Sequence, residues 1–304
     1  MNVLITGITG YIGSRLAPRL LREGHSVRGF SRHPEAVRAD FPVVAGDAVS
    51  GRGLERAMKG IDVAYFLIHS MEPSVDGSFA ARDLAAAENF ASAARAAGTE
   101  RIVYLGGLIP AEGPRSAHLA SRLEVEETLL AAAPGSVALR ASIVIGARSR
   151  PFRFLVRLVE RLPVVPLPAW RIKRTTPIDE RDMVELLART ATNEAAAGRA
   201  LDVGGPEELS YRELIERIRD HLLLGRPTLG LGRVTAMPIA SRVAAVIAGE
   251  EYELIGPLME SLATDLLADG TKAADLLGVR LHSLDSAIEH ALREWESTEA
   301  LAAR

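Results

Sequence analysis

Short apolar runs alternate with alanine-rich amphipathic stretches along residues 1–140 of the chain. Short runs of β-branched residues are typical of buried strands, and their alternation with helical patterns is typical of βαβ units around a parallel sheet. The predicted strands lie near residues 3–6, 26–30, 43–46, 63–68, 102–105 and 137–140. The pattern therefore predicts an α/β protein with a doubly wound parallel sheet of the Rossmann type.

The segments between these strands have the spacing of helices that bury one face. Ile12, Leu16 and Leu20 recur at helical intervals in the first of them, and Gly24 is a typical stop signal after such a helix. Residues 78–97 and 116–132 predict two long helices that cross over to the next strand. Related folds often pair through helices in these positions, so a homodimer built on them is one expectation for the assembly.

The alternation breaks after Gly146, where the proline-punctuated stretch LPVVPLPAW begins a different pattern. A helix from about residue 182, a strand near 200–203 and further helices to the end are predicted there. We therefore expect a Rossmann domain over residues 1–147. Residues 148–304 are expected to form a smaller, mostly helical substrate lobe that is partly interleaved with the first domain.

Composition limits the classes of function. The 304 residues carry a net charge of -3, are 48% hydrophobic and contain no cysteine, which is the composition of an ordinary soluble globular protein with a full core. The absence of cysteine excludes thiol nucleophiles, disulfide scaffolds and zinc sites built on cysteine. The acidic pI near 6.2 argues against a nucleic-acid coat. No apolar run reaches the length of a membrane span, so a cytoplasmic protein is expected.

Residues 148–174 contain eight basic residues and one acidic residue, Glu160. Two interpretations are open. The stretch is either a site for an anionic substrate or an acidic partner surface, or a solvated arginine face above Phe154, Leu155 and Leu158.

The clearest chemical motif is Gly7-x-x-Gly10-x-x-Gly13 at the end of the first strand and the start of the first helix. Glycine allows the tight turn, the close approach of backbone to a pyrophosphate and close helix–strand packing. The helix N-terminus adds free N–H groups and partial positive charge. The context predicts a dinucleotide site that includes Thr9, Tyr11 and Ile12.

The residues after the second strand indicate which dinucleotide binds. An NAD protein usually places a carboxylate there, whereas this chain has Ser31 and Arg32. A guanidinium and a hydroxyl suit a 2′-phosphate, so NADP(H) is predicted; the alternative is that Arg32 is one more solvated arginine. Asp47, beside Ala48 after the third strand, suits either the adenine amino group or an ordinary turn.

A series of segments resembles the short-chain dehydrogenase/reductase family, in its atypical, NmrA-like NAD(P)H-binding branch related to an accessory subunit of respiratory complex I. The resemblance covers nearly the whole chain, in the segments TGITGYIGSRL, YFLIHSM, ENFASAARAAGTERIVYLGG, LRASIVIGA, LPVVPLPAW, TTPIDERD and DVGGPEELSYREL. It implies a cofactor across the carboxyl ends of the strands. The residues that it places beside this cofactor are Leu67, Ile68, His69, Gly106, Gly107, Ala141 and Ile143.

The resemblance also exposes departures at the catalytic positions. Catalytic members carry a tyrosine and a lysine four residues apart on one helix, and these positions are His118 and Arg122 here. The helper serine after the fifth strand is replaced by Gly106 or Gly107, and the asparagine of the long helix by Asp83. Arg122 can still donate to ribose hydroxyls, while His118 and His69 are the candidate proton donors.

These observations favour an NADPH-dependent reductase of a small apolar carbonyl, enone or quinone. The alternative is a non-catalytic NADPH-binding sensor or scaffold, because binding survives the loss of tyrosine and lysine whereas their proton chemistry does not. Sugar epimerase and dehydratase chemistry is less favoured because it depends on the missing base. The histidines show no metal-binding spacing, so no metal site is predicted.

Overall fold

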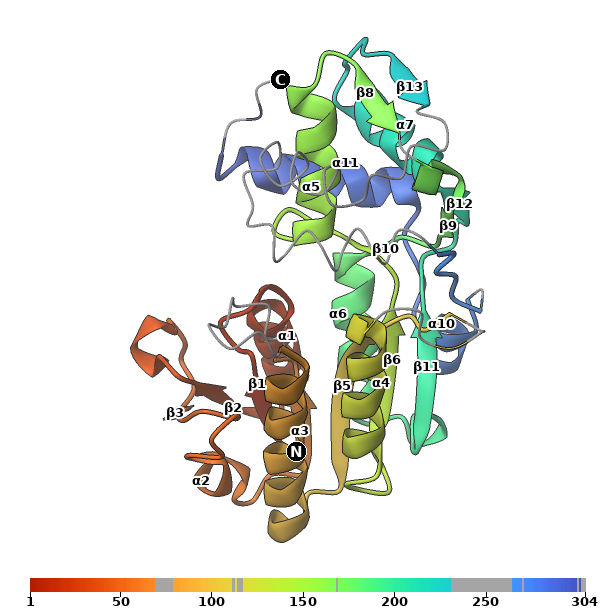
Figure 1. The fold of residues 1–304 in the computed structure, drawn as a ribbon. Coiled ribbons are helices and arrows are strands. Elements are labelled where there is room, and N and C mark those ends of the chain that lie inside the picture. Colours follow the sequence, from red (N-terminus) through yellow and green to blue (C-terminus); the bar gives the residue numbers. More distant parts are fainter. Residues whose placement is uncertain are drawn as a thin grey trace.

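The computed structural model describes residues 1–68, 79–110, 113, 117–167, 169–230, 264–269, 271–299 and 301, without the side chains of residues 79, 117 and 118. Its centre is a seven-stranded sheet in the order β11-β6-β5-β4-β1-β2-β3, with every neighbouring pair parallel (Figure 1). The strands are β1 (Asn2–Thr6), β2 (Ser26–Ser31), β3 (Val43–Ala45), β4 (Val63–Phe66), β5 (Arg101–Gly107), β6 (Val137–Ala141) and β11 (Arg199–Val203). The predicted α/β class and parallel Rossmann sheet are confirmed.

Strand β4 ends two residues earlier than the predicted stretch 63–68. The reason lies in Thr6 at the end of β1, whose hydroxyl donates to the carbonyl of Tyr65 at 2.9 Å. The same hydroxyl accepts the N–H of Leu67 at 3.2 Å. The Thr6 side chain thus replaces the backbone hydrogen bonds between β1 and β4 at their carboxyl ends, and the backbone after Phe66 leaves the sheet there.

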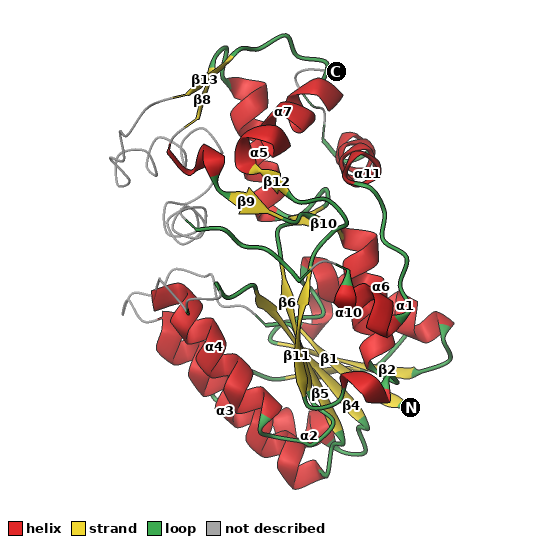
Figure 2. Ribbon diagram, turned by 90° about the vertical axis from the view of Figure 1, so that its right-hand side faces the viewer, coloured by secondary structure: helices red, strands yellow, loops and turns green. Residues whose placement is uncertain are grey.

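Helices cover both faces of the sheet (Figure 2). One face carries α1 (Tyr11–Arg22), α6 (Glu180–Thr190) and α10 (Lys272–Leu277), and the other α2 (Leu54–Met58), α3 (Phe79–Ala97) and α4 (Ala117–Leu130). Helix α1 forms as predicted, with Leu16 and Leu20 fully buried against the strands. Parallel sheets need this cover on both faces because their strands are apolar on both sides.

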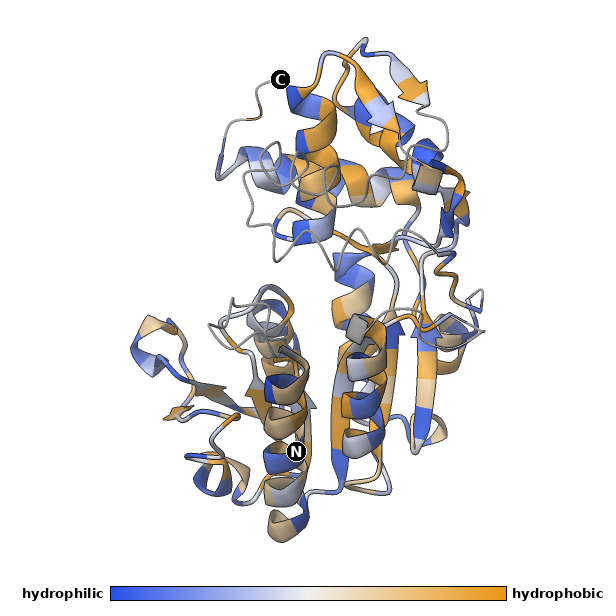
Figure 3. Cartoon of the chain, in the orientation of Figure 1, coloured by the Kyte–Doolittle hydropathy of each residue, from blue (hydrophilic) through white to orange (hydrophobic). Residues whose placement is uncertain are grey.

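A second group of elements forms its own core beyond the carboxyl ends of the strands (Figures 1 and 3). It contains the helices α5 (Arg150–Arg161), α7 (Tyr211–His221) and α11 (Leu284–Glu296). Its short strands pair as β8 (Val165–Leu167) with β13 (Thr228–Gly230) and β9 (Arg174–Thr175) with β12 (Leu209–Ser210). Phe152, Ile218 and Trp295 are fully buried there, and Trp170 packs edge-to-face on Tyr211 at 5.9 Å.

The chain passes between the two cores several times. After β6 it forms β7 (Val144–Ile145), which pairs with β10 (Ile178–Asp179) directly before α6. It then returns to the sheet as β11, which lies beside β6. The remaining short elements are the 3-10 turns η1 (Pro34–Ala36), η2 (Ala169–Ile172) and η3 (Glu194–Ala196). Residues from the second half of the sequence thus complete the sheet of the first.

The basic stretch 148–174 is extensively paired within the chain. Arg153 and Arg157 stack over the ring of Trp295, at 4.2 and 4.9 Å from its centroid, and both form ion pairs with Glu299. Arg157 also pairs with Glu160 at 2.5 Å, and Arg174 with Glu208 at 2.8 Å. Much of the local charge seen in the sequence is therefore neutralised by distant acidic residues. Among the helices that the structure describes, none combines the length and apolarity required to cross a bilayer.

Candidate functional site

The glycine turn between β1 and α1 leaves no room for side chains. Gly7 has a φ of +66°, and a Cβ there would lie 2.5 Å from the carbonyl oxygen of Leu67. A Cβ on Gly13 would lie 2.3 Å from the carbonyl oxygen of Gly7. The N–H of Gly10 donates to that same oxygen at 2.8 Å, which closes the turn. Each of the three glycines is therefore required by the backbone around it.

Helix α1 begins directly after this turn with its N-terminal N–H groups available. Gly10 is the N-cap residue and supplies no capping side chain, and the first turn contains no acidic residue. Most helices satisfy these N–H groups with a side chain of the N-cap residue. Here the partial positive charge of the helix is left to act on a ligand, which is the arrangement that binds phosphate groups.

The turn lies where the order of the strands reverses. From β1 the chain builds outward through β2 and β3, and then returns to place β4 on the other side of β1. In open parallel sheets the ligand crevice lies outside the carboxyl ends of the strands at this reversal. Leu67 and Ile68 follow β4 at this edge. The candidate proton donor His69 lies outside the described residues.

Ser31 and Arg32 lie on the same edge as the glycine turn. Phe30 of β2 is in register with Thr6 of β1, so the residues that follow each strand emerge side by side. The hydroxyl of Ser31 accepts the N–H of His33 at 3.1 Å, and Arg32 is exposed. A cleft of about 370 Å³ opens between α1 and residues 36–41, and Thr9 and Arg38 are among its lining residues. The sequence analysis did not single out Arg38, since its position depends on how residues 36–41 fold back toward α1.

Asp47 is held in a local turn after β3. One carboxylate oxygen accepts the N–H of Val49 at 3.1 Å, and the other accepts the hydroxyl of Ser50 at 3.1 Å. These contacts are those of an Asx turn, so its carboxylate already has partners in the chain. Ala48 is buried in the core under α2 and α3.

The carboxyl ends of β5 and β6 meet at the next part of this edge. Gly107 is in register with Ala141, and the N–H of Leu108 donates to the carbonyl of Ala141 at 3.2 Å. A Cβ on Gly107 would meet nothing within 4 Å, whereas one on Gly106 would lie 2.9 Å from the ring of Tyr104. Ile143 follows, and its carbonyl accepts the N–H of Ile178. Gly107 thus borders open space, while Gly106 makes room for a tyrosine ring.

Tyr104 and Arg122 form a pair that the sequence analysis did not identify. The guanidinium of Arg122 lies over the Tyr104 ring, 5.6 Å from its centroid, which holds Arg122 by a cation–π interaction near the end of β5. The Tyr104 hydroxyl is buried and has no hydrogen-bond partner among the residues that the structure describes, and burial raises the pKa of this phenol. Asp83 of α3, also buried, acts electrostatically on the same phenol.

The two positions that correspond to the family's tyrosine and lysine lie on one helix. Residues 118 and 122 both lie on α4, one turn apart, and the side chain of His118 lies outside the described residues. Arg122 is half-buried beside Tyr104.

Comparison with known proteins finds a family match in the N-terminal part of the chain. Residues 7–142 match a family model described as NAD(P)H-binding. This segment contains the glycine turn, Arg32 and the ends of β4, β5 and β6.

Relatives extend the similarity beyond that segment. Uncharacterized proteins of Mycobacterium tuberculosis and Mycobacterium bovis are 28% identical over 269 residues, which is 86% of this chain and 27% of theirs, so the chain spans about a quarter of their length. A 2-alkyl-3-oxoalkanoate reductase of Stenotrophomonas maltophilia is 27% identical over 72% of this chain and 74% of its own. A (4-alkanoyl-5-oxo-2,5-dihydrofuran-3-yl)methyl phosphate reductase of Streptomyces griseus is 28% identical over 74% of both.

Solved structures share the whole fold. The NDP-hexosamine 5,6-dehydratase TunA superposes with a TM-score of 0.72 at 18% identity over 100% of both chains. MoeE5 in complex with UDP-glucose and NAD superposes with a TM-score of 0.71 at 22% identity, over 98% of this chain and 99% of its own. At these identities the likeness extends to the fold alone.

Proposed function

We propose, from the premise that the chain is a short-chain dehydrogenase/reductase of the atypical type with an NAD(P)H-binding domain, that it is an NADPH-dependent reductase. Its substrate would be a small, largely apolar carbonyl compound, enone or quinone. The observation that carries the proposal is the side-chain-free glycine turn before an uncapped helix, at the reversal point of a parallel sheet.

The residues at this edge fit a dinucleotide. The N–H groups at the start of α1 would hold the pyrophosphate, with Gly7, Gly10 and Gly13 allowing its close approach. Along the rest of the edge, Leu67, Ile68, Gly107, Ala141 and Ile143 would line the nicotinamide half. Gly106 supports this half indirectly, since its missing side chain accommodates the ring of Tyr104.

The choice of NADPH over NADH rests on charge at the end of β2. Arg32 is exposed on the edge shared with the glycine turn, and Arg38 lines the neighbouring cleft. A guanidinium bound to phosphate forms paired, charge-assisted hydrogen bonds. Asp47 contributes less than the sequence suggested, because its carboxylate is already used in a turn.

The chemistry needs one hydride and one proton. When bound, the reduced nicotinamide supplies the hydride. Arg122, held over Tyr104, would donate hydrogen bonds to ribose hydroxyls and so orient the reacting ring. His118 on the same helix, or His69 after β4, would give the proton to the substrate oxygen as the carbonyl is reduced.

The substrate class is supported by the later half of the chain and by the relatives. Elements within residues 148–304 form most of the second core, and β11 completes the sheet, which supports a substrate lobe over the strand ends. The names of the two reductase relatives describe an alkyl-substituted oxo acid and an alkanoyl-substituted unsaturated lactone phosphate. Common to both are an alkyl chain and a reducible carbonyl or conjugated double bond, and each name also includes an anionic group, a carboxylate or a phosphate.

A second candidate function follows from one specific observation. Helix α4 carries histidine and arginine at the positions where the family resemblance implies a tyrosine and a lysine in catalytic members. The alternative is therefore an NADPH-binding sensor or scaffold without turnover, stabilised by its bound cofactor.

The test has two stages. Titration of the purified chain with NADPH and NADH, followed by nicotinamide fluorescence, is expected to show saturable binding with tighter NADPH; no binding of either to folded protein overturns the proposal, and tighter NADH overturns the role of Arg32. NADPH oxidation is then followed against quinones, aldehydes and enones. Turnover that falls at least tenfold in His118→Ala or His69→Ala supports the proton-donor role, whereas binding without turnover favours the sensor.

A further inference from the structure

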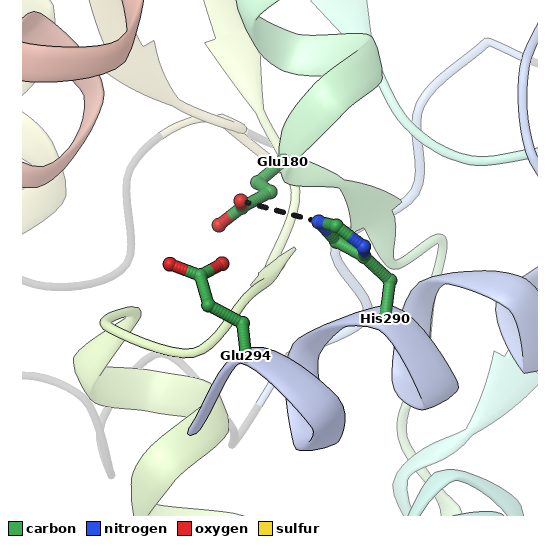
Figure 4. A group of neighbouring side chains, drawn as sticks. All are labelled: Glu180, His290 and Glu294. Atoms are coloured by element: carbon green, nitrogen blue, oxygen red, sulfur yellow. Dashed lines mark ion pairs between the residues drawn. The ribbon is translucent and has the colours of Figure 1, made fainter. Parts of the chain in front are cut away.

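Three titratable side chains from two helices meet where the two cores join (Figure 4). Glu180 is the first residue of α6, and His290 and Glu294 lie one turn apart on α11. One possible ligand atom from each lies within 4.8 Å of the other two, and Nε2 of His290 is 3.8 Å from Oε1 of Glu180. In Figure 4 the two carboxylates and the imidazole point toward one another.

Most oxygens of this cluster are buried and have no hydrogen-bond partner among the described residues. Glu180 is 1% exposed; its Oε2 has no such partner, and its Oε1 has only ion-pair contacts, to Arg15 at 3.2 Å and to His290 at 3.8 Å. Oε2 of Glu294 and the hydroxyl of Tyr11 also lack a hydrogen bond there. Four of the seven buried side-chain atoms without a hydrogen bond in the described part of the chain are thus gathered here. Such groups normally find a partner, because each unsatisfied one costs about 1–3 kcal/mol.

Gly146 creates the space into which these oxygens project. A Cβ on Gly146 would lie 1.7 Å from the hydroxyl oxygen of Tyr11 and 2.1 Å from Oε2 of Glu180. Any larger residue at 146 would therefore collide with Tyr11 and Glu180. Tyr11 reaches it from the first turn of α1, so elements of both cores surround one polar space.

The charges around this space do not balance. Arg15 of α1 pairs with Oε1 of Glu180 at 3.2 Å and with Oε1 of Glu294, which sets one guanidinium against two carboxylates. Arg181 forms an ion pair with Asp179, the N-cap residue of α6, so the charges of these two residues cancel. Burial, and after it the neighbouring Glu294, raises the pKa of Glu180 to about 8. Burial and Arg181 lower the pKa of His290, so its imidazole is neutral at neutral pH and can act as a ligand.

A divalent cation satisfies more of these groups than a proton does. A single proton placed between the carboxylates would neutralise the charge but engage only two oxygens. A cation can be coordinated by the carboxylates of Glu180 and Glu294 and by the imidazole of His290 at the same time. The ligands of a tetrahedral zinc ion at about 2.0–2.1 Å lie about 3.3 Å apart, so the observed 3.8 Å between Glu180 and His290 requires a small contraction. The other two pairs of ligand atoms contract from separations of up to 4.8 Å.

We propose that Glu180, Glu294 and His290 form a binding site for a divalent transition-metal ion. Carboxylate and imidazole ligands of this kind suit Zn²⁺ and Mn²⁺, and three protein ligands leave a position for water beside the Tyr11 hydroxyl. Arg15 remains on Glu294 as an outer partner that orients its carboxylate. The ion joins α6, which packs on the sheet, to α11 of the second core, so it fixes the two cores relative to each other. This site does not depend on the proposed reductase activity.

The test uses the full chain, without a histidine tag and stripped of metal with a chelator. Titration with Zn²⁺, Mn²⁺ or Co²⁺ alone, followed by calorimetry and by Co²⁺ absorption, is expected to show one ion per chain and a melting temperature that rises with metal concentration. Glu180→Gln and His290→Ala are each expected to weaken binding at least tenfold. Glu294→Gln, at a half-buried position, serves if Glu180→Gln does not fold.

Matched controls come from helices α11 and α7. Glu289→Gln removes an exposed carboxylate of α11 that pairs with Arg293, and His221→Ala removes a histidine that pairs with Asp285. Both are expected to bind metal as the parent chain does. The proposal is overturned if no saturable binding occurs at millimolar metal, or if Glu180→Gln binds as tightly as its controls. One further result overturns the proposal. If added metal does not change how stability depends on pH, and Glu180→Gln removes only that pH dependence, the cluster is a protonated carboxylate pair and not a metal site.

Discussion

Replacing Gly13 with alanine is expected to weaken NADPH binding strongly while the chain remains folded. The added Cβ would lie 2.3 Å from the carbonyl oxygen of Gly7 and 3.0 Å from its carbonyl carbon. Both atoms are backbone atoms of the turn, so no side-chain rotation can relieve the contact. The turn itself must shift, and with it the N–H groups at the start of α1.

The size of the effect follows from two costs. Overpacking of this kind costs about 1–3 kcal/mol, which is smaller than the typical 5–15 kcal/mol stability of a folded domain. Each hydrogen bond to a charged phosphate contributes about 1.5–3 kcal/mol. The loss of one such bond therefore weakens NADPH binding by about 10- to 100-fold, since 1.4 kcal/mol corresponds to a factor of ten.

The assay is a fluorescence titration with NADPH, accompanied by circular dichroism and thermal unfolding. Gly225→Ala is the matched control, because a Cβ there meets nothing within 4 Å and the same glycine-to-alanine change is made. Wild-type affinity in a folded Gly13→Ala variant would refute the assignment of this turn to the pyrophosphate. Equal loss of affinity in Gly225→Ala would show that the effect is not local.

Three further predictions concern other parts of the molecule. Arg32→Ala is expected to weaken NADPH binding by about tenfold or more and to leave NADH binding unchanged, since only NADPH carries the 2′-phosphate; equal losses for both cofactors would contradict this role. Tyr104→Phe removes a buried hydroxyl without a partner and keeps the ring under Arg122, so urea unfolding should show a gain of about 1–3 kcal/mol; a loss of stability would show that the hydroxyl has a partner in solution. Folded Glu180 keeps its proton up to about pH 8, whereas an unfolded glutamic acid loses it near its ordinary pKa of 4.5, so the folded state binds more protons in this window. The metal-free chain should therefore lose stability as pH rises from about 4.5 to 8, and Glu180→Gln should flatten this decline in unfolding curves measured across pH; an unchanged slope would contradict the shifted pKa.

The sheet and the glycine turn were largely predictable from the sequence, because both depend on residues that are close together in the chain. A buried strand needs a short apolar run, and a helix on a sheet needs apolar residues at helical spacing, as in Leu16 and Leu20. The glycine motif is similar, since Gly7 and Gly13 constrain each other within one turn. The end of β4 was predicted two residues late, because it depends on the hydroxyl of Thr6 from another strand.

The surroundings of the candidate catalytic positions were less predictable. The sequence indicated which positions correspond to the family's tyrosine and lysine, and the structure places both on α4. Nothing local to β5 indicated that Tyr104 would fold over Gly106 and lie under Arg122. That contact depends on how α4 packs on the sheet, which side-chain spacing alone does not encode.

The sequence by itself determined the order of strands and helices, the glycine turn and the basic residue after β2, because each rests on neighbours only a few positions apart. The tertiary structure alone decided which charges meet. It brought Glu299 to Arg153 and Arg157, so that the basic stretch is paired, and it set Glu180 against His290 and Glu294 around Gly146. Electrostatic partners are selected by distance in space, and separations of more than a hundred residues leave no periodic trace in the chain.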